Sequence, residues 1–162
     1  MSSLNQPDGS AVLPTFSTLS LPQPIVTALA RQEIVNPSPV QMAVIPDALA
    51  GKNVLGRART GSGKTLAFGL PVLARLAGRT SRPRAPRALI LLPTRELATQ
   101  VRAAMEPLAQ KMGLRLTTVY GGVPINKQIN TLKNGVDVVI ATPGRLSPGS
   151  QPDESSGAAP DC

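Results

Sequence analysis

Histidine and tryptophan are absent from this 162-residue sequence, and Cys162 is its single cysteine. One cysteine forms no intrachain disulfide, and the usual donors of a zinc site are missing. The aromatic residues are only Phe16, Phe68 and Tyr120, so Ala, Val, Leu and Ile must build the core, and an array of base-stacking aromatics is excluded. No apolar run approaches the roughly 18 residues that span a bilayer, and the polar start carries no signal sequence. We therefore expect one soluble, cytoplasmic domain without membrane association.

Acidic residues are scarce in most of the chain. Residues 1–145 contain 17 basic and 6 acidic side chains, a net charge of +11, whereas the last 17 residues contain 3 acidic side chains and no basic one. Ten basic residues and no acidic one lie between Asp47 and Glu96. Such a charge distribution favours a polyanionic partner, a nucleic acid or a nucleotide, but a basic surface also serves solubility alone. Charge leaves both interpretations open.

Short apolar, β-branched runs alternate with longer stretches of helical pattern. The expected strands are 53–57, 88–92, 116–119 and 136–141, and the expected helices are 22–32, 39–50, 64–77, 94–111 and 124–134. Strands separated by helices predict an α/β fold with a parallel sheet, formed by residues 15–146. Residues 1–14 and 147–162 are polar and rich in Pro, Gly and Ser, so we expect them to be disordered tails.

The most specific motif is the stretch Ala58-Arg59-Thr60-Gly61-Ser62-Gly63-Lys64-Thr65, which follows an apolar run and opens a helical stretch. Its glycines allow backbone N–H groups to converge on phosphate oxygens, and the helix N-terminus adds a favourable dipole. In such a loop the Lys64 ammonium reaches the terminal phosphates, and the Thr65 hydroxyl can bind magnesium. The motif therefore predicts a phosphate site, although Ala58 replaces the glycine of the strict pattern.

A second candidate lies upstream of this loop. Ser38, Pro39 and Gln41 match a capping box at the start of a helix. A glutamine amide can also pair with the N6 and N7 edge of adenine, and Phe16 is an isolated aromatic that could cover a base. The residues alone leave both interpretations open.

These segments, together with 93–98, the pair Gly121-Gly122 and 142–145, occur in the order and spacing of the N-terminal half of a DEAD-box ATP-dependent RNA helicase. The sequence resembles the bacterial type most, over about residues 14–146. The resemblance implies a RecA-like P-loop NTPase domain in which Gln41 selects adenine and Phe16 stacks on it. It implies ATP phosphates on the 58–65 loop and Mg²⁺ at Thr65. Glu33 stands where the family usually has glycine, and we expect little effect from it.

The resemblance also implies an RNA-binding face. By their own chemistry Thr94 is a helix N-cap, Gly121-Gly122 is a turn, and Thr142 and Pro143 begin a helix. In the family these loops grip the sugar-phosphate backbone of single-stranded RNA without reading its sequence, with Arg95 and Arg145 as phosphate ligands. The implied RNA-binding residues are Pro93, Thr94, Arg95, Glu96, Gly121, Gly122, Thr142, Pro143, Gly144 and Arg145.

The family's Asp-Glu-Ala-Asp motif, whose carboxylates orient magnesium and water, does not occur in the sequence. Asp153-Glu154 follows Arg145 too closely to stand in for it, and we expect residues from 147 onward to be unrelated to the family. The Ser-Ala-Thr motif and the second RecA-like domain are also not found. We therefore assign no catalytic residue and expect a chain that does not hydrolyse ATP.

In the family, the strands that carry the two missing motifs lie between the phosphate-loop strand and the other strands. We therefore expect an incomplete sheet and a marginally stable, aggregation-prone chain. The alternative function is a non-catalytic RNA-binding or partner-binding module. A small P-loop kinase is disfavoured, since a kinase has no use for residues 93–98 and 142–145.

Overall fold

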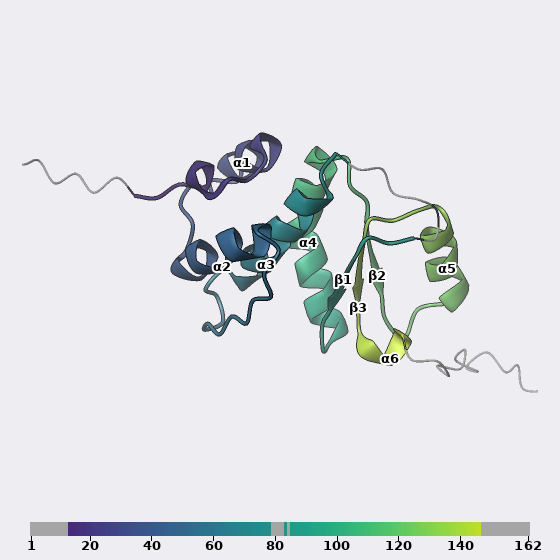
Figure 1. The fold of residues 1–162 in the computed structure, drawn as a ribbon. Coiled ribbons are helices and arrows are strands. Elements are labelled where there is room, and N and C mark those ends of the chain that lie inside the picture. The colour runs from purple at the N-terminus through teal and green to yellow at the C-terminus, as the bar shows by residue number, and fades with distance from the viewer. Residues whose placement is uncertain (1–12, 79–82, 84, 147–162) are drawn as a thin grey trace, which may run out of the picture.

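The computed structural model describes residues 13–78, 83 and 85–146. In chain order its elements are the 3-10 helix η1 (Phe16–Leu19), α1 (Gln23–Ala30), α2 (Pro39–Leu49), α3 (Lys64–Leu76), β1 (Ala88–Leu91), α4 (Arg95–Lys111), β2 (Leu116–Val119), α5 (Ile125–Lys133), β3 (Val138–Ala141) and α6 (Pro143–Leu146). Figure 1 shows α1, α2 and α3 on one side of α4 and the sheet on the other.

The strands form a parallel sheet in the order β1-β3-β2. All four residues of the central strand β3 are buried. Because successive side chains of a strand point to opposite faces, the sheet has two apolar faces. One face joins the main core with α4, and the other packs against α5 through Val119, Val139, Ala141 and Leu132. α4 and α5 therefore cover opposite faces of the sheet (Figure 1).

Helices α3 and α4 approach closely at a glycine. A Cβ on Gly69 would lie 3.1 Å from the Met105 sulfur, so the small residue sets the separation of the two helices. α1 also packs on α4, and α2 packs on α3. α4 thus lies between the α2–α3 pair and the sheet, as Figure 1 shows.

The predicted α/β fold with a parallel sheet is confirmed, and three predicted strands and five predicted helices form with ends within two residues of those expected. The fourth prediction, a strand at 53–57, is wrong. This segment has no regular secondary structure, and the Leu55 side chain is fully exposed. A strand needs a hydrogen-bonded neighbour, and none lies beside this segment among the residues described. The sheet was expected to be incomplete, and a three-stranded sheet without segment 53–57 agrees with that expectation.

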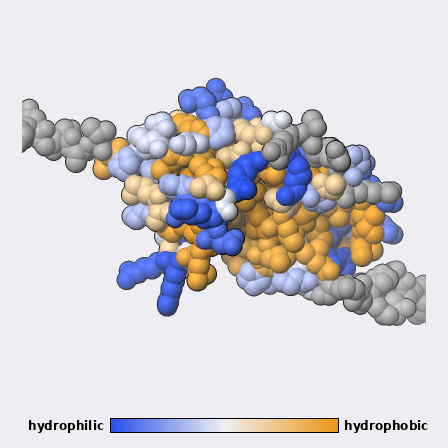
Figure 2. All heavy atoms as spheres, viewed as in Figure 1, coloured by the Kyte–Doolittle hydropathy of each residue, from blue (hydrophilic) through white to orange (hydrophobic). Residues whose placement is uncertain are grey.

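The predicted tails fall outside the described residues, except for Leu13 and Pro14. The edge strand β1 leaves apolar surface uncovered. Leu89 is 54% exposed and Leu91 is 53% exposed. Figure 2 shows a broad hydrophobic surface over the part of the molecule where β1 lies. An uncovered edge of this kind is a site for association with other chains.

Glu33 has a backbone conformation that explains why glycine suits its position. Its φ angle is +61°, in the left-handed region, just after α1 ends. There the Ile34 N–H donates to the Leu29 carbonyl and closes the helix end. A side chain in this region costs about 1 kcal/mol or more relative to glycine. The glutamate therefore strains the helix end, an effect on stability that sequence reasoning did not foresee.

A buried carboxylate connects all three strands. Asp137 is 2% exposed and precedes β3. Its Oδ1 accepts from the Arg87 guanidinium, 3.1 Å from Nε, and its Oδ2 accepts from the Arg115 N–H at 2.8 Å. Arg87 comes just before β1 and Arg115 just before β2, so this side chain fixes where all three strands begin.

We predict that Asp137→Ala lowers the free energy of unfolding by about 3 kcal/mol, because the partly buried Arg87 loses its counter-charge. Asp137→Asn, which keeps acceptor oxygen, should lose less. Urea unfolding measures the difference. The control is Glu106→Ala, which breaks the more exposed pair with Arg102 and should cost about 0.5 kcal/mol or less. Equal losses for Asp137→Ala and Glu106→Ala would refute the role given to Asp137.

Candidate nucleotide site and nucleic-acid interface

The 58–65 loop takes a conformation that depends on its glycines. Gly61 and Gly63 have φ angles of +80° and +85°, which side-chain-bearing residues rarely adopt. Gly63 is the N-cap of α3, so the helix begins at Lys64 as predicted. The loop therefore ends on a helix N-terminus, where backbone N–H groups are directed at a potential anion.

Lys64 folds back over its own loop. Its Nζ donates to the Ala58 carbonyl and, at 3.0 Å, to the Arg59 carbonyl. The Ser62 Oγ is buried and has no hydrogen-bond partner among the described residues. The loop thus contains a cation and an unsatisfied hydroxyl. Thr65 is half-buried in the first turn of α3.

Gln41 connects α2 to this loop. Its side chain is 4% exposed; its Oε1 accepts from the Ser38 N–H at 2.8 Å, and its Nε2 donates to the Gly63 carbonyl at 3.0 Å. A Cβ on Gly63 would lie 2.4 Å from Nε2, so the contact leaves no room for a side chain there. The bond from Ser38 to Gln41 belongs to the predicted capping box. The contact with Gly63 spans 22 residues and was not predicted.

Phe16, the predicted stacking residue, is 1% exposed and packs in the main core. Its N–H donates to the Val35 carbonyl at 3.3 Å. The structure thus brings Gln41 and the 58–65 loop together, while the Phe16 ring is covered by other side chains. Stacking of this ring on a base stays a prediction.

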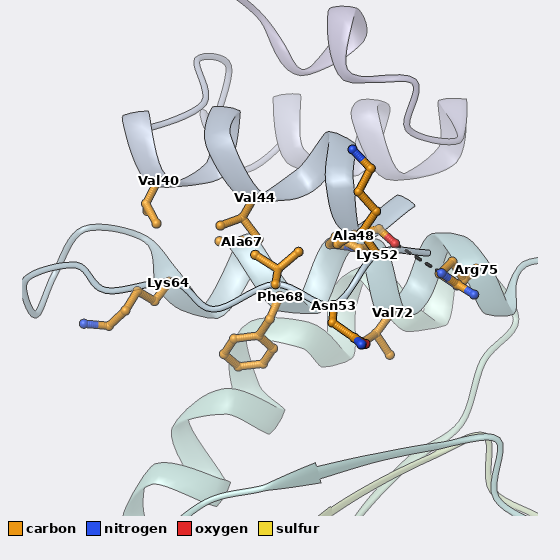
Figure 3. A pocket seen from close by; sticks show the side chains of 13 residues that line it. Val40, Val44, Ala48, Lys52, Asn53, Lys64, Ala67, Phe68, Val72 and Arg75 are labelled. Carbon is orange, nitrogen blue, oxygen red and sulfur yellow. Dashed lines mark hydrogen bonds between the residues drawn. The ribbon is translucent and has the colours of Figure 1, made fainter. Parts of the chain in front are cut away.

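A cavity of about 410 Å³ lies between α2 and α3. Val40 and Val44 from α2 and Phe68 and Val72 from α3 line it, and Figure 3 shows Lys64 extending away from them at one end. Lys52 and Arg75 lie toward the other end, where Arg75 donates to the Ala48 carbonyl. The cavity has apolar walls and cationic ends.

The implied RNA-binding residues follow the three strands. Residues 93–96 follow β1, Gly121-Gly122 follow β2, and 142–145 follow β3. Since the strands are parallel, their carboxyl ends meet at one edge of the sheet, where α/β proteins commonly bind ligands. Pro93, Thr94, Arg95, Glu96, Gly121, Gly122, Pro143 and Gly144 are exposed, and Thr142 and Arg145 are half-buried.

The predicted capping role of Thr94 is confirmed, because its Oγ1 accepts from the Leu97 N–H at 3.3 Å. Gly122 has a φ angle of +75°, which suits the predicted turn. Arg145 is engaged within the protein, since its Nη2 donates to the Val123 carbonyl. The Thr142 N–H donates to the Val119 carbonyl at 3.1 Å. The turn after β2 is thus connected to the loop after β3.

Sequence reasoning did not single out Tyr120 or Gln128. The Arg95 guanidinium lies over the Tyr120 ring, 4.9 Å from its centre. Gln128, 9% exposed on α5, donates from Nε2 to the Tyr120 carbonyl at 2.9 Å. The hydroxyls of Thr118 and Thr99 and the charge of Arg95 lower the pKa of Tyr120. Tyr120 could have been noticed in the sequence, because it is the single tyrosine and directly precedes Gly121-Gly122. Nothing in the sequence distinguishes Gln128.

Two features are missing from the described residues. No helix there is long and apolar enough to cross a membrane. No three acidic, cysteine or histidine side chains gather there into a possible metal site.

The chain is similar to named proteins over most of its length. It is 51% identical over 134 residues to a probable ATP-dependent RNA helicase, ddx27, of Dictyostelium discoideum, covering 83% of this chain and 17% of the relative. It is 46% identical over 136 residues to the ATP-dependent RNA helicase RhlB of Xanthomonas oryzae, covering 82% of this chain and 24% of that protein. The chain thus spans about a fifth of the length of such relatives.

Solved structures have the same fold. A DEAD box protein from the hyperthermophile Methanococcus jannaschii matches with a TM-score of 0.74 and 38% identity, over 82% of this chain and 35% of that one. The RNA helicase Prp28 from Chaetomium thermophilum, bound to ADP, matches with a TM-score of 0.76 and 36% identity, over 83% and 33% of the two chains. The family model described as DEAD/DEAH box helicase matches residues 38–153. With its motif loops at one edge of a RecA-like sheet, this chain belongs to the DEAD/DEAH box helicase family.

Proposed function

We propose that this chain binds ATP on the 58–65 loop and the phosphate backbone of single-stranded RNA at the carboxyl edge of its sheet. The observation that carries the proposal is the common placement of three loops at that edge, each following a parallel strand. The names of its relatives, ATP-dependent RNA helicases, and the ADP in the Prp28 structure support it.

The loop suits phosphate in three ways. Gly61 and Gly63 hold its left-handed turns, the orphaned Ser62 hydroxyl can bond a phosphate oxygen, and Lys64 supplies positive charge. To reach a phosphate, the Lys64 ammonium leaves the carbonyls of Ala58 and Arg59. Phosphate thus replaces two bonds to neutral carbonyl oxygens with bonds to anionic oxygens, in which donor and acceptor are both charged. Magnesium, held by the nucleotide and the Thr65 hydroxyl, would neutralise phosphate charge.

The base specificity comes from Gln41. Its NH2 group can donate to N7 of adenine and its carbonyl oxygen can accept from N6, whereas guanine offers two acceptors at that edge. Its Oε1 already accepts from the Ser38 N–H, and its Nε2 already donates to the Gly63 carbonyl. Each bond uses only one of the two N–H groups of Nε2 or one of the two lone pairs of Oε1, so adenine can bond the same amide that already contacts the phosphate loop. Selection of the base and the shape of the loop are connected through one side chain.

We expect Mg-ATP and ADP to raise the melting temperature of the chain, because ligands that bind only the folded state stabilise it. GTP should raise it much less. Lys64→Ala should remove most of the shift, while Lys133→Ala, a lysine at the end of α5, should keep it. Thermal unfolding with each nucleotide measures this. Equal shifts with ATP and GTP, or a full shift in Lys64→Ala, would overturn the nucleotide site; RNA binding without any nucleotide effect would favour the non-catalytic module.

RNA binding at the sheet edge rests on charge and backbone donors. Arg95 is exposed and, within the described residues, forms no ion pair with a carboxylate. The N–H groups of Gly121 and Gly122 also have no partner there. Such donors bind phosphates and carry no information about the base sequence. Arg145, bonded to Val123, acts in this proposal mainly by shaping the neighbouring turn.

We expect RNA affinity to fall steeply with salt and to be similar for oligonucleotides of different sequence, since counterions are released on phosphate binding. Arg95→Ala should weaken binding and reduce the slope of log K against log salt by about one. Arg31→Ala, an exposed arginine at the end of α1, is the control. Fluorescence anisotropy with labelled single-stranded RNA at several salt concentrations measures both. Salt-independent or strongly sequence-selective binding contradicts the proposal.

We further propose that this 162-residue chain does not hydrolyse ATP by itself. Phosphoryl transfer to water needs a group that orients the water and the metal. The family's acidic motif is not in the sequence, and no acidic cluster lies in the described part of the chain.

We expect phosphate release to stay at background with saturating ATP and RNA, and Lys64→Ala to change nothing. Turnover that RNA stimulates and Lys64→Ala abolishes would show that another carboxylate performs this role.

A further inference from the structure

Tyr120 contacts the proposed RNA edge in three ways. Its ring lies beneath the Arg95 guanidinium, with 4.9 Å between the guanidinium carbon and the ring centre. Its hydroxyl lies near the Thr118 and Thr99 hydroxyls, which lower its pKa together with Arg95. Its carbonyl accepts the bond from Gln128. One residue thus connects the loop after β1 with the turn after β2.

The ring holds Arg95 mainly through its aromatic face and leaves most of the guanidinium N–H donors to other partners. A guanidinium over an aromatic face is attracted through its π-surface, and its N–H groups point outward in the plane. Since Arg95 forms no ion pair with a carboxylate among the described residues, its full charge stays available to an anion. A free arginine side chain would sample many rotamers, so the ring restricts it in advance of binding.

The turn beside Arg95 is fixed from the other side. Gln128 is nine-tenths buried, and its amide holds the Tyr120 carbonyl at 2.9 Å. The next two residues are Gly121 and Gly122, whose N–H groups are unbonded in the described part of the chain. The Arg95 Nη1 lies 3.5 Å from where a Cβ on Gly122 would stand. The guanidinium and the turn are therefore neighbours.

From this geometry we infer that Tyr120 is a positioning residue for RNA. Its ring orients Arg95. Its backbone, held by Gln128, places the Gly121-Gly122 turn beside that guanidinium. The guanidinium and the N–H groups of the turn can then bind the same stretch of RNA phosphate. Tyr120 acts through Arg95 and needs no contact with RNA itself. The inference rests on the proposed RNA binding and adds to it a residue that the motif loops do not include.

A double-mutant cycle between Tyr120 and Arg95 tests the inference on the 162-residue chain. The variants are Tyr120→Leu, Tyr120→Phe, Arg95→Ala and the double variant Arg95→Ala with Tyr120→Leu. The probe is a labelled single-stranded oligouridine at low salt, followed by anisotropy. Tyr120→Leu should weaken RNA binding about two- to fivefold, the size expected for a lost cation–π contact. Tyr120→Phe, which keeps the aromatic ring, should bind RNA with wild-type affinity.

The coupling between the Tyr120 and Arg95 substitutions distinguishes a positioning role of Tyr120 from a merely structural one. In the Arg95→Ala background, Tyr120→Leu should have no further effect on RNA affinity, and nucleotide protection should stay unchanged in every variant. An equal loss in both backgrounds, or a loss in Tyr120→Phe as large as in Tyr120→Leu, overturns the inference. If Arg95→Ala weakens binding and Tyr120→Leu does not, the inference fails while RNA binding stands. If Arg95→Ala itself has no effect, the proposed RNA edge fails.

A second measurement needs neither RNA nor a stable leucine variant. Tyr120 is the only tyrosine and the sequence has no tryptophan, so intrinsic tyrosine emission reports this site alone. Removing the guanidinium in Arg95→Ala should change the emission, and inorganic polyphosphate, which has no absorbing bases, should change it in the wild type but not in Arg95→Ala. Tyrosine emission that is the same in the wild type and Arg95→Ala, and that polyphosphate does not alter in the wild type, contradicts the placement of Arg95 on the ring.

Discussion

The buried Asp137 carboxylate is the interaction on which the sheet depends. Parallel strands need a fixed register, because a shift by one residue would turn every apolar side chain to the wrong face. Asp137 provides that register by holding the residues that precede β1 and β2, while its own backbone leads into β3. The carboxyl ends of the strands lie four residues further along each strand. A constraint at one end of the sheet therefore aligns the three loops at the other end.

The protein's own side chains form hydrogen bonds within the 58–65 loop. Lys64 bonds loop carbonyls, and Gln41 bonds the carbonyl of Gly63. The contact with Gly63 satisfies the amide of Gln41, which is buried away from water, whereas Lys64 is exposed. In the proposed complex, a phosphate on Lys64 would replace the bonds of its ammonium to the loop carbonyls. The affinity proposed for the loop is thus the free-energy difference between the bonds to the ligand and these internal bonds, and a substitution of Gln41 in α2 would alter it.

Local features were predictable from the sequence and long-range contacts were not. The start of α3 at Lys64 and the cap at Thr94 follow from neighbouring residues, so pattern and propensity predict them. The segment 53–57 has a strand pattern, but a strand forms only with a partner, which a local pattern cannot reveal. The contact of Gln41 with Gly63, and that of Arg145 with Val123, each join residues 22 apart. Such contacts depend on how the helices pack.

The strand order also has a consequence for the growing chain. β1 and β2 both pair with β3, which is the last of the three to be synthesised. Neither can enter the sheet until residue 141 has left the ribosome. At a synthesis rate of roughly 5–20 residues per second, the apolar strand β1 stays unpaired for about 3 to 10 s before β3 is complete. During that time the α1–α4 helices can already pack, so the sheet is completed onto a helical layer that exists before it.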